Sequence, residues 1–274
     1  MKSRSIIYFA TTKTTTITLS VFFVALVFVV LTTQIQSQHA MAALPKNIIA
    51  AAFKPLSEFS GQSQVDVYKK YLDSSDTTVT FTPWAIINSN GKQLPGSKTI
   101  EVGSIAKEKN QISKWKGSIF KTIAFDIEGA SKDSCPYSIQ TIQQASQIAH
   151  NNGFKFTTVP GVGCNSASKL TAFAKVSDMV ILQAEGHQGR GATVWKNFVT
   201  SSISAIKAGK TGIPIIIEVA VSNDSGYNHV SYLESLYSSV ASQVNGIHVW
   251  FSDNHPGELK QADQILGWFV NKYG

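Results

Sequence analysis

Two acidic side chains end a hydrophobic segment of this 274-residue chain. The segment runs Lys-Thr-Ile-Ala-Phe-Asp-Ile-Glu, and its acids, Asp126 and Glu128, are two positions apart. Alternate side chains of a β-strand share a face, so both acids lie on one face while isoleucine and phenylalanine occupy the other. Burying two like charges is costly unless they share a proton, accept hydrogen bonds or meet a cation. The pattern therefore predicts acid chemistry at a strand end, with a solvated acidic pair in a loop as the alternative.

Apolar, β-prone stretches alternate with longer amphipathic stretches along the rest of the chain. The predicted strands are Ile48 to Phe53, Val79 to Ile87, Thr122 to Ile127, Phe156 to Pro160, Met179 to Glu185, Ile215 to Val221 and Ile247 to Ser252. The predicted helices are Gln64 to Leu72, Ile105 to Trp115, Ser138 to Asn151, Ala167 to Ala174, Val194 to Ala208, Val230 to Val244 and Leu259 to Lys272. Strand and helix in alternation predict an α/β fold with a parallel sheet.

The sheet is predicted to close into a (β/α)8-type TIM barrel with one irregular or missing unit. Seven units are recognisable, and the stretch Asn88 to Ser104 contains either the eighth strand or a hairpin at Asn90-Gly91. The alternative is an open, doubly wound sheet. No glycine-rich phosphate-binding motif follows the first strand, which argues against the dinucleotide-binding form of that alternative.

Five predicted strands have one apolar and one more polar face. Because parallel strands end at one rim, the polar side chains are expected to converge there. The strand residues expected on this face, besides Asp126 and Glu128, are Thr80, Thr82, Trp84, Gln183, Glu185, Glu218, His248, Trp250 and Ser252. Taken singly, Glu218 fits a structural ion pair and His248 a buried core histidine. The loops after the strands add Tyr227 and Asp253 as candidate ligand-binding residues.

Two chemistries use this set of residues. Glycoside hydrolysis needs one protonated carboxyl group, an opposing charged group and aromatic rings that stack on sugars. Divalent-metal catalysis uses acids from successive strands as ligands. His187, His229 and His255 lack the short, regular spacing of a zinc site, so neither a metal nor another cofactor is expected.

The first 42 residues have the layout of a secretory signal. Lys2, Arg4 and Lys13 precede the apolar run Ile17 to Leu31, and Ala40-Met41-Ala42 offers a cleavage site. An uncleaved signal anchor is the alternative. Either way, residues 43–274 are expected to form one exported barrel domain, extracellular or held on the outer face of the membrane.

Charge and composition describe a packed globular protein. Without the three leader cations, 21 basic face 17 acidic residues, a net charge of +4 with no basic block in the sequence. Nucleic acid is therefore not an expected partner, and membrane contact is expected only through an uncleaved leader. The two cysteines, Cys135 and Cys164, follow successive strands and predict a disulfide in an exported protein.

The segment Phe125-Asp126-Ile127-Glu128 resembles the end of the family 18 chitinase motif Asp-Gly-x-Asp-x-Asp-x-Glu, and it is similar to the Asp-x-Glu pair of family 25 lysozymes. The earlier acids of the chitinase motif are absent here. The resemblance implies a TIM-barrel glycoside hydrolase in which Glu128 is the general acid and Asp126 orients it. Glu218 or Glu185 is then the base or nucleophile, with Trp84 and Trp250 as sugar platforms and Gln183 and His248 as substrate contacts. The alternatives are a catalytically silent carbohydrate-binding or cell-surface barrel and a metal-dependent enzyme.

Overall fold

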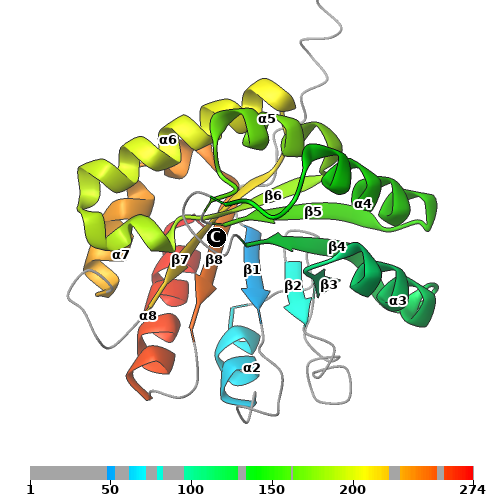
Figure 1. Ribbon diagram of the computed structural model, residues 1–274. Helices are drawn as coiled ribbons and strands as arrows, with labels where there is room; N and C mark the ends of the chain where they lie inside the picture. Colours follow the sequence, from blue (N-terminus) through cyan, green and yellow to red (C-terminus); the bar gives the residue numbers. More distant parts are fainter. Residues whose placement is uncertain are drawn as a thin grey trace, which may run out of the picture. The chain divides into compact units, whose positions relative to one another are not determined.

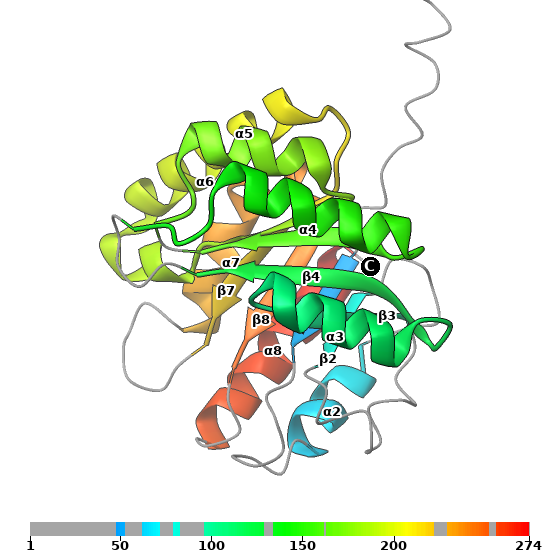
Figure 2. The same cartoon turned by 45° about the vertical axis from the view of Figure 1, so that its right-hand side comes forward.

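The computed structural model describes residues 48–52, 62–71, 79–82, 96–128, 134–161, 163–221, 229–251 and 256–273. These residues form a closed barrel of eight parallel strands, which neighbour one another in chain order. The helices surround the strands (Figure 1). A second view shows α3 and α4 side by side along the outside of β4 (Figure 2). The α/β barrel predicted from the sequence is confirmed.

The strands are β1 (Ile48–Ala52), β2 (Val79–Thr82), β3 (Ser97–Val102), β4 (Phe120–Ile127), β5 (Lys155–Pro160), β6 (Met179–Gln183), β7 (Ile215–Ala220) and β8 (Gly246–Trp250). The α-helices are α2 (Gln62–Lys69), α3 (Ile105–Trp115), α4 (Ile139–Asn151), α5 (Ala167–Val176), α6 (Ala192–Gly209), α7 (Val230–Ser238) and α8 (Pro256–Tyr273). Two short 3-10 helices, η3 (Glu185–Arg190) and η5 (Ala241–Gln243), complete the described elements. None of the described helices is both long enough and apolar enough to cross a membrane.

The eighth strand is β3, inside the stretch that the sequence left open between a strand and a hairpin. In β3, Thr99 and Glu101 alternate with the apolar residues Ile100 and Val102. The charges of Lys98 and Glu101 make this short segment hard to recognise as a strand from its sequence. Pairing with both β2 and β4 settles the assignment, because β3 closes the gap between them. Residues 83–95, which join β2 to β3, lie outside the described part of the chain.

The two faces of each strand have different neighbours. The outer face packs against the helices in two clusters, one of which contains Ile123 and Phe125 of β4. The inner face carries a separate apolar cluster formed by first and middle residues of the strands, Ile48, Ala124, Met179, Ile181 and Ile216, together with Val159 near the end of β5. This cluster fills the barrel interior on the side nearer the strand starts, as expected for layers of inward side chains. Polar inward residues follow it toward the strand ends.

Strand register corrects one prediction. Thr80 and Thr82 pair with Lys98 and Ile100, and Ile100 belongs to an outer cluster. Paired residues of neighbouring strands share a face, so the backbone places these two threonine positions on the outer face rather than the inner one. Short runs without strong polar alternation do not fix register from sequence alone.

Two helices, α3 and α4, begin directly after a serine that caps their first turn. Ser104 accepts a hydrogen bond from the Lys107 backbone N–H at 3.2 Å, and Ser138 accepts one from Thr141 N–H at 3.1 Å. Both contacts satisfy amides that the first helical turn leaves unpaired. The helix predicted from Val230 to Val244 ends at Ser238, and η5 follows it.

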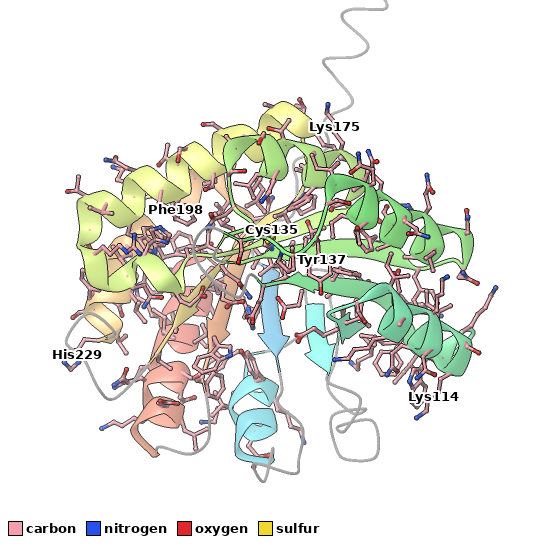
Figure 3. The ribbon with its side chains drawn as sticks, in the orientation of Figure 1. Lys114, Cys135, Tyr137, Lys175, Phe198 and His229 are labelled. Atoms are coloured by element: carbon pink, nitrogen blue, oxygen red, sulfur yellow. A yellow bond between two sulfur atoms is a disulfide. The ribbon has the colours of Figure 1, made fainter. Side chains whose placement is uncertain are left out.

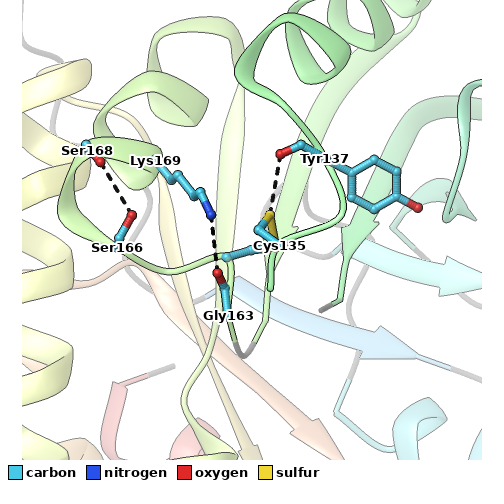
Figure 4. Close-up of a disulfide and its surroundings, with 7 residues drawn as sticks. Cys135, Tyr137, Gly163, Ser166, Ser168 and Lys169 are labelled. Atoms are coloured by element: carbon cyan, nitrogen blue, oxygen red, sulfur yellow. Dashed lines mark hydrogen bonds between the residues drawn. A yellow bond between two sulfur atoms is a disulfide. The ribbon is translucent and has the colours of Figure 1, made fainter. Parts of the chain in front are cut away.

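The predicted disulfide between Cys135 and Cys164 is confirmed. It joins the connections that follow β4 and β5, with Cα atoms 4.8 Å apart (Figure 4). Cys164 is fully buried. Lys169 Nζ donates to the Gly163 carbonyl at 3.4 Å beside the bridge. The bridge therefore ties together two loops at the end of the barrel where the acids lie.

Candidate active site

Polar side chains from adjacent strands form a row inside the barrel at its C-terminal end. Gln183 of β6 pairs in register with Glu218 of β7, which pairs with His248 of β8. All three are at least nine-tenths buried. His248 Nδ1 lies 2.6 Å from Glu218 Oε2, within hydrogen-bond distance. Three of the predicted site residues therefore lie side by side, and the imidazole fixes the orientation of the Glu218 carboxyl group.

Gln183 links this row to Asp126 across the end of β5. Its Nε2 donates to Asp126 Oδ1 at 3.4 Å. The amide passes so close to Gly161 that a Cβ built there would lie 2.0 Å from Gln183 Oε1. Only glycine leaves this space, so the absence of a side chain at position 161 lets Gln183 reach Asp126.

Glu185 is held at the mouth by a 3-10 helix and not by β6, which ends two residues earlier. The helix is fastened to β7 through Gln188, whose Nε2 donates to the Ala220 carbonyl at 2.9 Å while its Oε1 accepts from Ala220 N–H at 2.8 Å. Tyr232 Oη donates to the Gln188 carbonyl. The sequence assigned Glu185 to the end of a strand, whereas the structure places it in η3.

Asp126 retains its proton near neutral pH. Burial raises the pKa of Asp126 to about 8, and the negative charges of four nearby glutamates add to the rise: Glu101, Glu128, Glu218 and Glu185. The acids therefore lie close enough to influence one another's ionisation. Three strands, β3, β4 and β7, together with η3 bring them to one place although up to 117 residues separate them in the chain.

Glu185 is also a protonated acid near neutral pH. Burial is the largest cause that raises the pKa of Glu185, to about 8. The charges of Glu218 and Glu128 add to the rise, and a hydrogen bond from its own backbone N–H opposes it. Carboxyl groups that share a confined site cannot all ionise, so the group holds protons that water-exposed acids would release. Such a group can donate protons at neutral pH.

Glu101 is the functional candidate that sequence reasoning missed. It lies on the inner face of β3, paired with Ala124. Glu101 as a whole keeps exposed surface, but protein surrounds its carboxyl group. This burial raises the pKa of Glu101; the charge of Glu218 adds to the rise and His248 opposes it. The alternation of Thr99 and Glu101 with apolar residues was the available signal. It was not used because the sequence left this stretch open between a strand and a hairpin.

Glu128 and Trp250 are exposed to solvent at the mouth. Glu128 follows β4 directly and is exposed. Trp250, at the end of β8, is 37 % exposed. The predicted site residues Trp84, Tyr227 and Asp253 lie outside the described residues, so their positions stay predictions.

A pocket of about 360 Å³ opens between the first turns of α7 and α8, the helices that follow β7 and β8. Its lining is largely polar and includes His229, Ser231, Lys260, Gln261 and Gln264. Within the described ranges, no group of three or more histidine, cysteine, aspartate or glutamate side chains is arranged to hold a metal ion.

No protein-family model matches the sequence. The curated proteins contain no match to it either. Solved structures do match the fold. The spore cortex-lytic enzyme SleL of Bacillus megaterium has a TM-score of 0.54 at 9% identity, covering 85% of this chain and 75% of its own. A chitinase from Chromobacterium violaceum has a TM-score of 0.53 at 9% identity, covering 80% of this chain and 98% of its own.

A curdlan-specific exo-β-1,3-glucanase from Blastomyces gilchristii, solved with glucose, has a TM-score of 0.50 at 15% identity, covering 80% of this chain and 96% of its own. The match is not confined to glycosidases, since the tryptophan synthase α-subunit of Pyrococcus furiosus reaches a TM-score of 0.51 at 11% identity. Many unrelated activities share this barrel. The chain therefore has a TIM-barrel fold whose structural neighbours include glycoside hydrolases, and its activity must be argued from the site.

Proposed function

We propose that this chain is an exported glycoside hydrolase whose carboxyl cluster performs acid–base catalysis. The observation that carries the proposal is the convergence of Asp126, Glu128, Glu185 and Glu218 at the C-terminal end of the barrel. A sugar polymer can reach this end because Glu128 and Trp250 are exposed there. The apolar cluster below closes the barrel beneath the acids. The fold shared with a chitinase and a glucanase is consistent with this chemistry.

Each acid has a proposed role that follows from its surroundings. Glu128, exposed at the mouth, protonates the leaving oxygen of the glycosidic bond. Asp126 keeps a proton beside it, since its pKa of about 8 lies above neutral pH, and stabilises the charge left on Glu128. Glu218, oriented by His248, acts on the opposite side of the bond as base or nucleophile.

The polar pocket between α7 and α8 gives a polymer further hydrogen-bonding groups beside the mouth. Amide and lysine side chains such as Gln264 and Lys260 match the hydroxyl groups of sugars. A substrate of several sugar units is therefore favoured over a single sugar.

The test is hydrolysis of chitin oligosaccharides, β-1,3-glucan and spore-cortex peptidoglycan by the wild-type chain and by Glu128→Gln. The variant is expected to lose about 10² to 10⁴ of kcat while keeping its affinity for the sugar, because it removes the transferable proton and little volume. Glu234→Gln on α7, away from the mouth, is the matched control. Activity is also expected to fall as pH rises through about 8, where Asp126 and Glu185 release their protons.

Unchanged turnover in Glu128→Gln would remove that residue from the mechanism. Binding of these glycans without hydrolysis of any of them would favour the alternative of a silent carbohydrate-binding barrel, for which the exposed Trp250 offers a stacking surface.

A further inference from the structure

Exposed lysines gather at the end of the barrel opposite the carboxyl cluster. Each helix runs back along the barrel after its strand, so the last turns of the helices and the first residues of the strands lie at the same end. A lysine occupies the last turn of five helices: Lys69 of α2, Lys114 of α3, Lys175 of α5, Lys207 of α6 and Lys272 of α8. Lys114 and Lys175 are labelled at two of these helix ends in Figure 3.

The turn between α3 and β4 is the densest part of this end. Lys114 and Lys116 end α3, Lys121 begins β4, and Lys155 begins β5; all four are exposed. Strand register pairs Lys155 with Thr122, so Lys155 and Lys121 lie at the same end of the barrel on opposite faces of the sheet. We call these four lysines, with Ile119, the basic corner.

An apolar side chain stands out among these charges. Ile119 is 49 % exposed, the highest value among the large hydrophobic side chains described. Beside it, Trp115 is half-buried, and Lys114 Nζ lies 5.1 Å from the centre of its ring. An exposed aliphatic residue, a tryptophan and flanking lysines form the composition that proteins present to the lipid–water interface.

Helix dipoles explain only part of this arrangement. A lysine in the last turn of a helix is stabilised by the negative end of the dipole. That effect does not apply to Lys121 and Lys155, which begin strands, nor does it place Ile119 in water. From α3 to α6, the described carboxylate at this end is Asp178, which accepts hydrogen bonds from Phe156 N–H and lies 2.9 Å from His150 Nε2. Among the described residues from α3 to α6, lysines therefore outnumber acids at this end.

The composition of the basic corner indicates the partner. Its exposed lysines attract anionic headgroups, and Ile119 offers an apolar side chain that can enter the headgroup region. We propose that the basic corner binds an anionic lipid surface, with Ile119 entering the headgroup region and the carboxyl cluster facing away.

The experiment measures cosedimentation of the full chain with vesicles of neutral phosphatidylcholine alone or with about a third anionic phosphatidylglycerol. The leader and its three cations are the same in every variant, so a change in the ratio of the two affinities between wild type and variant reports on the lysines replaced. The triple variant Lys114→Gln, Lys116→Gln, Lys121→Gln is expected to reduce this ratio by on the order of a hundredfold. Ile119→Ser is expected to weaken binding to anionic vesicles roughly fivefold.

Matched controls come from the mouth side of the barrel. Lys107, Lys109 and Lys196 are exposed in the first halves of α3 and α6, and Val194 is 47 % exposed at the start of α6. Replacing those three lysines by glutamine, or Val194 by serine, is expected to leave the ratio and the binding unchanged. Equal losses from both lysine triples, or equal binding of wild-type chain to both vesicles, would overturn the proposal. Neither outcome depends on glycoside hydrolysis, which is assayed separately.

Discussion

Glu108 offers the sharpest test of the energetics of this fold. It lies in the first turn of α3, one turn before Ile112, and has no exposed surface. Within the described structure neither of its carboxyl oxygens has a hydrogen-bond partner. Burial raises its pKa from 4.5 to about 8, slightly offset by Lys109. No member of the carboxyl cluster contributes to this rise, so Glu108 can be studied independently of the active site.

The sign of the pH effect follows from the raised pKa. Between pH 4.5 and about 8 the folded chain keeps a proton on Glu108 that the unfolded chain releases. The free energy of unfolding therefore decreases as pH rises through this window and levels off above it. At about 1.36 kcal/mol per pH unit, the interval from 4.5 to 8 corresponds to about 5 kcal/mol, taken as an upper value.

The perturbation is Glu108→Gln, which preserves shape and polarity but cannot ionise. We expect it to match the wild-type chain in stability near pH 5 and to be more stable by about 3 to 5 kcal/mol at pH 9. In a domain of this size the difference corresponds to a rise in melting temperature of roughly 6 to 20 °C. Urea denaturation at pH 5, 7 and 9, with Glu234→Gln as the helix control, measures it. A stability difference that stays constant from pH 5 to 9 would show that Glu108 does not ionise in this range and would refute the reasoning.

Two further predictions concern the mouth of the barrel. Gly161→Ala places a Cβ about where Gln183 Oε1 now lies, so Gln183 should lose its contact with Asp126; we expect kcat to fall and its pH profile to shift, whereas an unchanged profile would argue against Gln183 as a positioning residue. Replacing Cys135 and Cys164 by serine opens a loop of 29 residues and should lower the free energy of unfolding by roughly 3 to 4 kcal/mol, as measured by urea denaturation; a loss below 1 kcal/mol would mean that the loops are held by other contacts.

Local sequence patterns were sufficient for most of the architecture. Seven of the eight described strands and all seven described α-helices lie where periodicity placed them, with ends that differ by up to six residues. β3 was ambiguous because it is short and charged, and its identity depends on pairing with β2 and β4. Strand register, which places Thr80 and Thr82 on the outer face, depends likewise on neighbouring strands and not on the local residues.

The candidate site was recognised in part. Asp126, Glu185, Glu218 and His248 were identified because polar residues at the end of an apolar strand are conspicuous. Their mutual influence could not be read from the chain, since it depends on how the barrel closes. The contact from Gln183 to Asp126 crosses β5 and requires glycine at position 161, which the sequence offers no reason to connect with either residue.

By itself, the sequence determined the repeating order of strand and helix, the two-faced strands, the acidic strand end and the paired cysteines, because each depends on residues close together in the chain. The tertiary structure alone decided which distant groups meet. Lysines that are scattered along the sequence gather at one end of the barrel, and acids from three strands and η3 gather at the other. The physical reason is the parallel barrel, which brings every strand end to one rim and every helix end to the opposite rim whatever their separation along the chain.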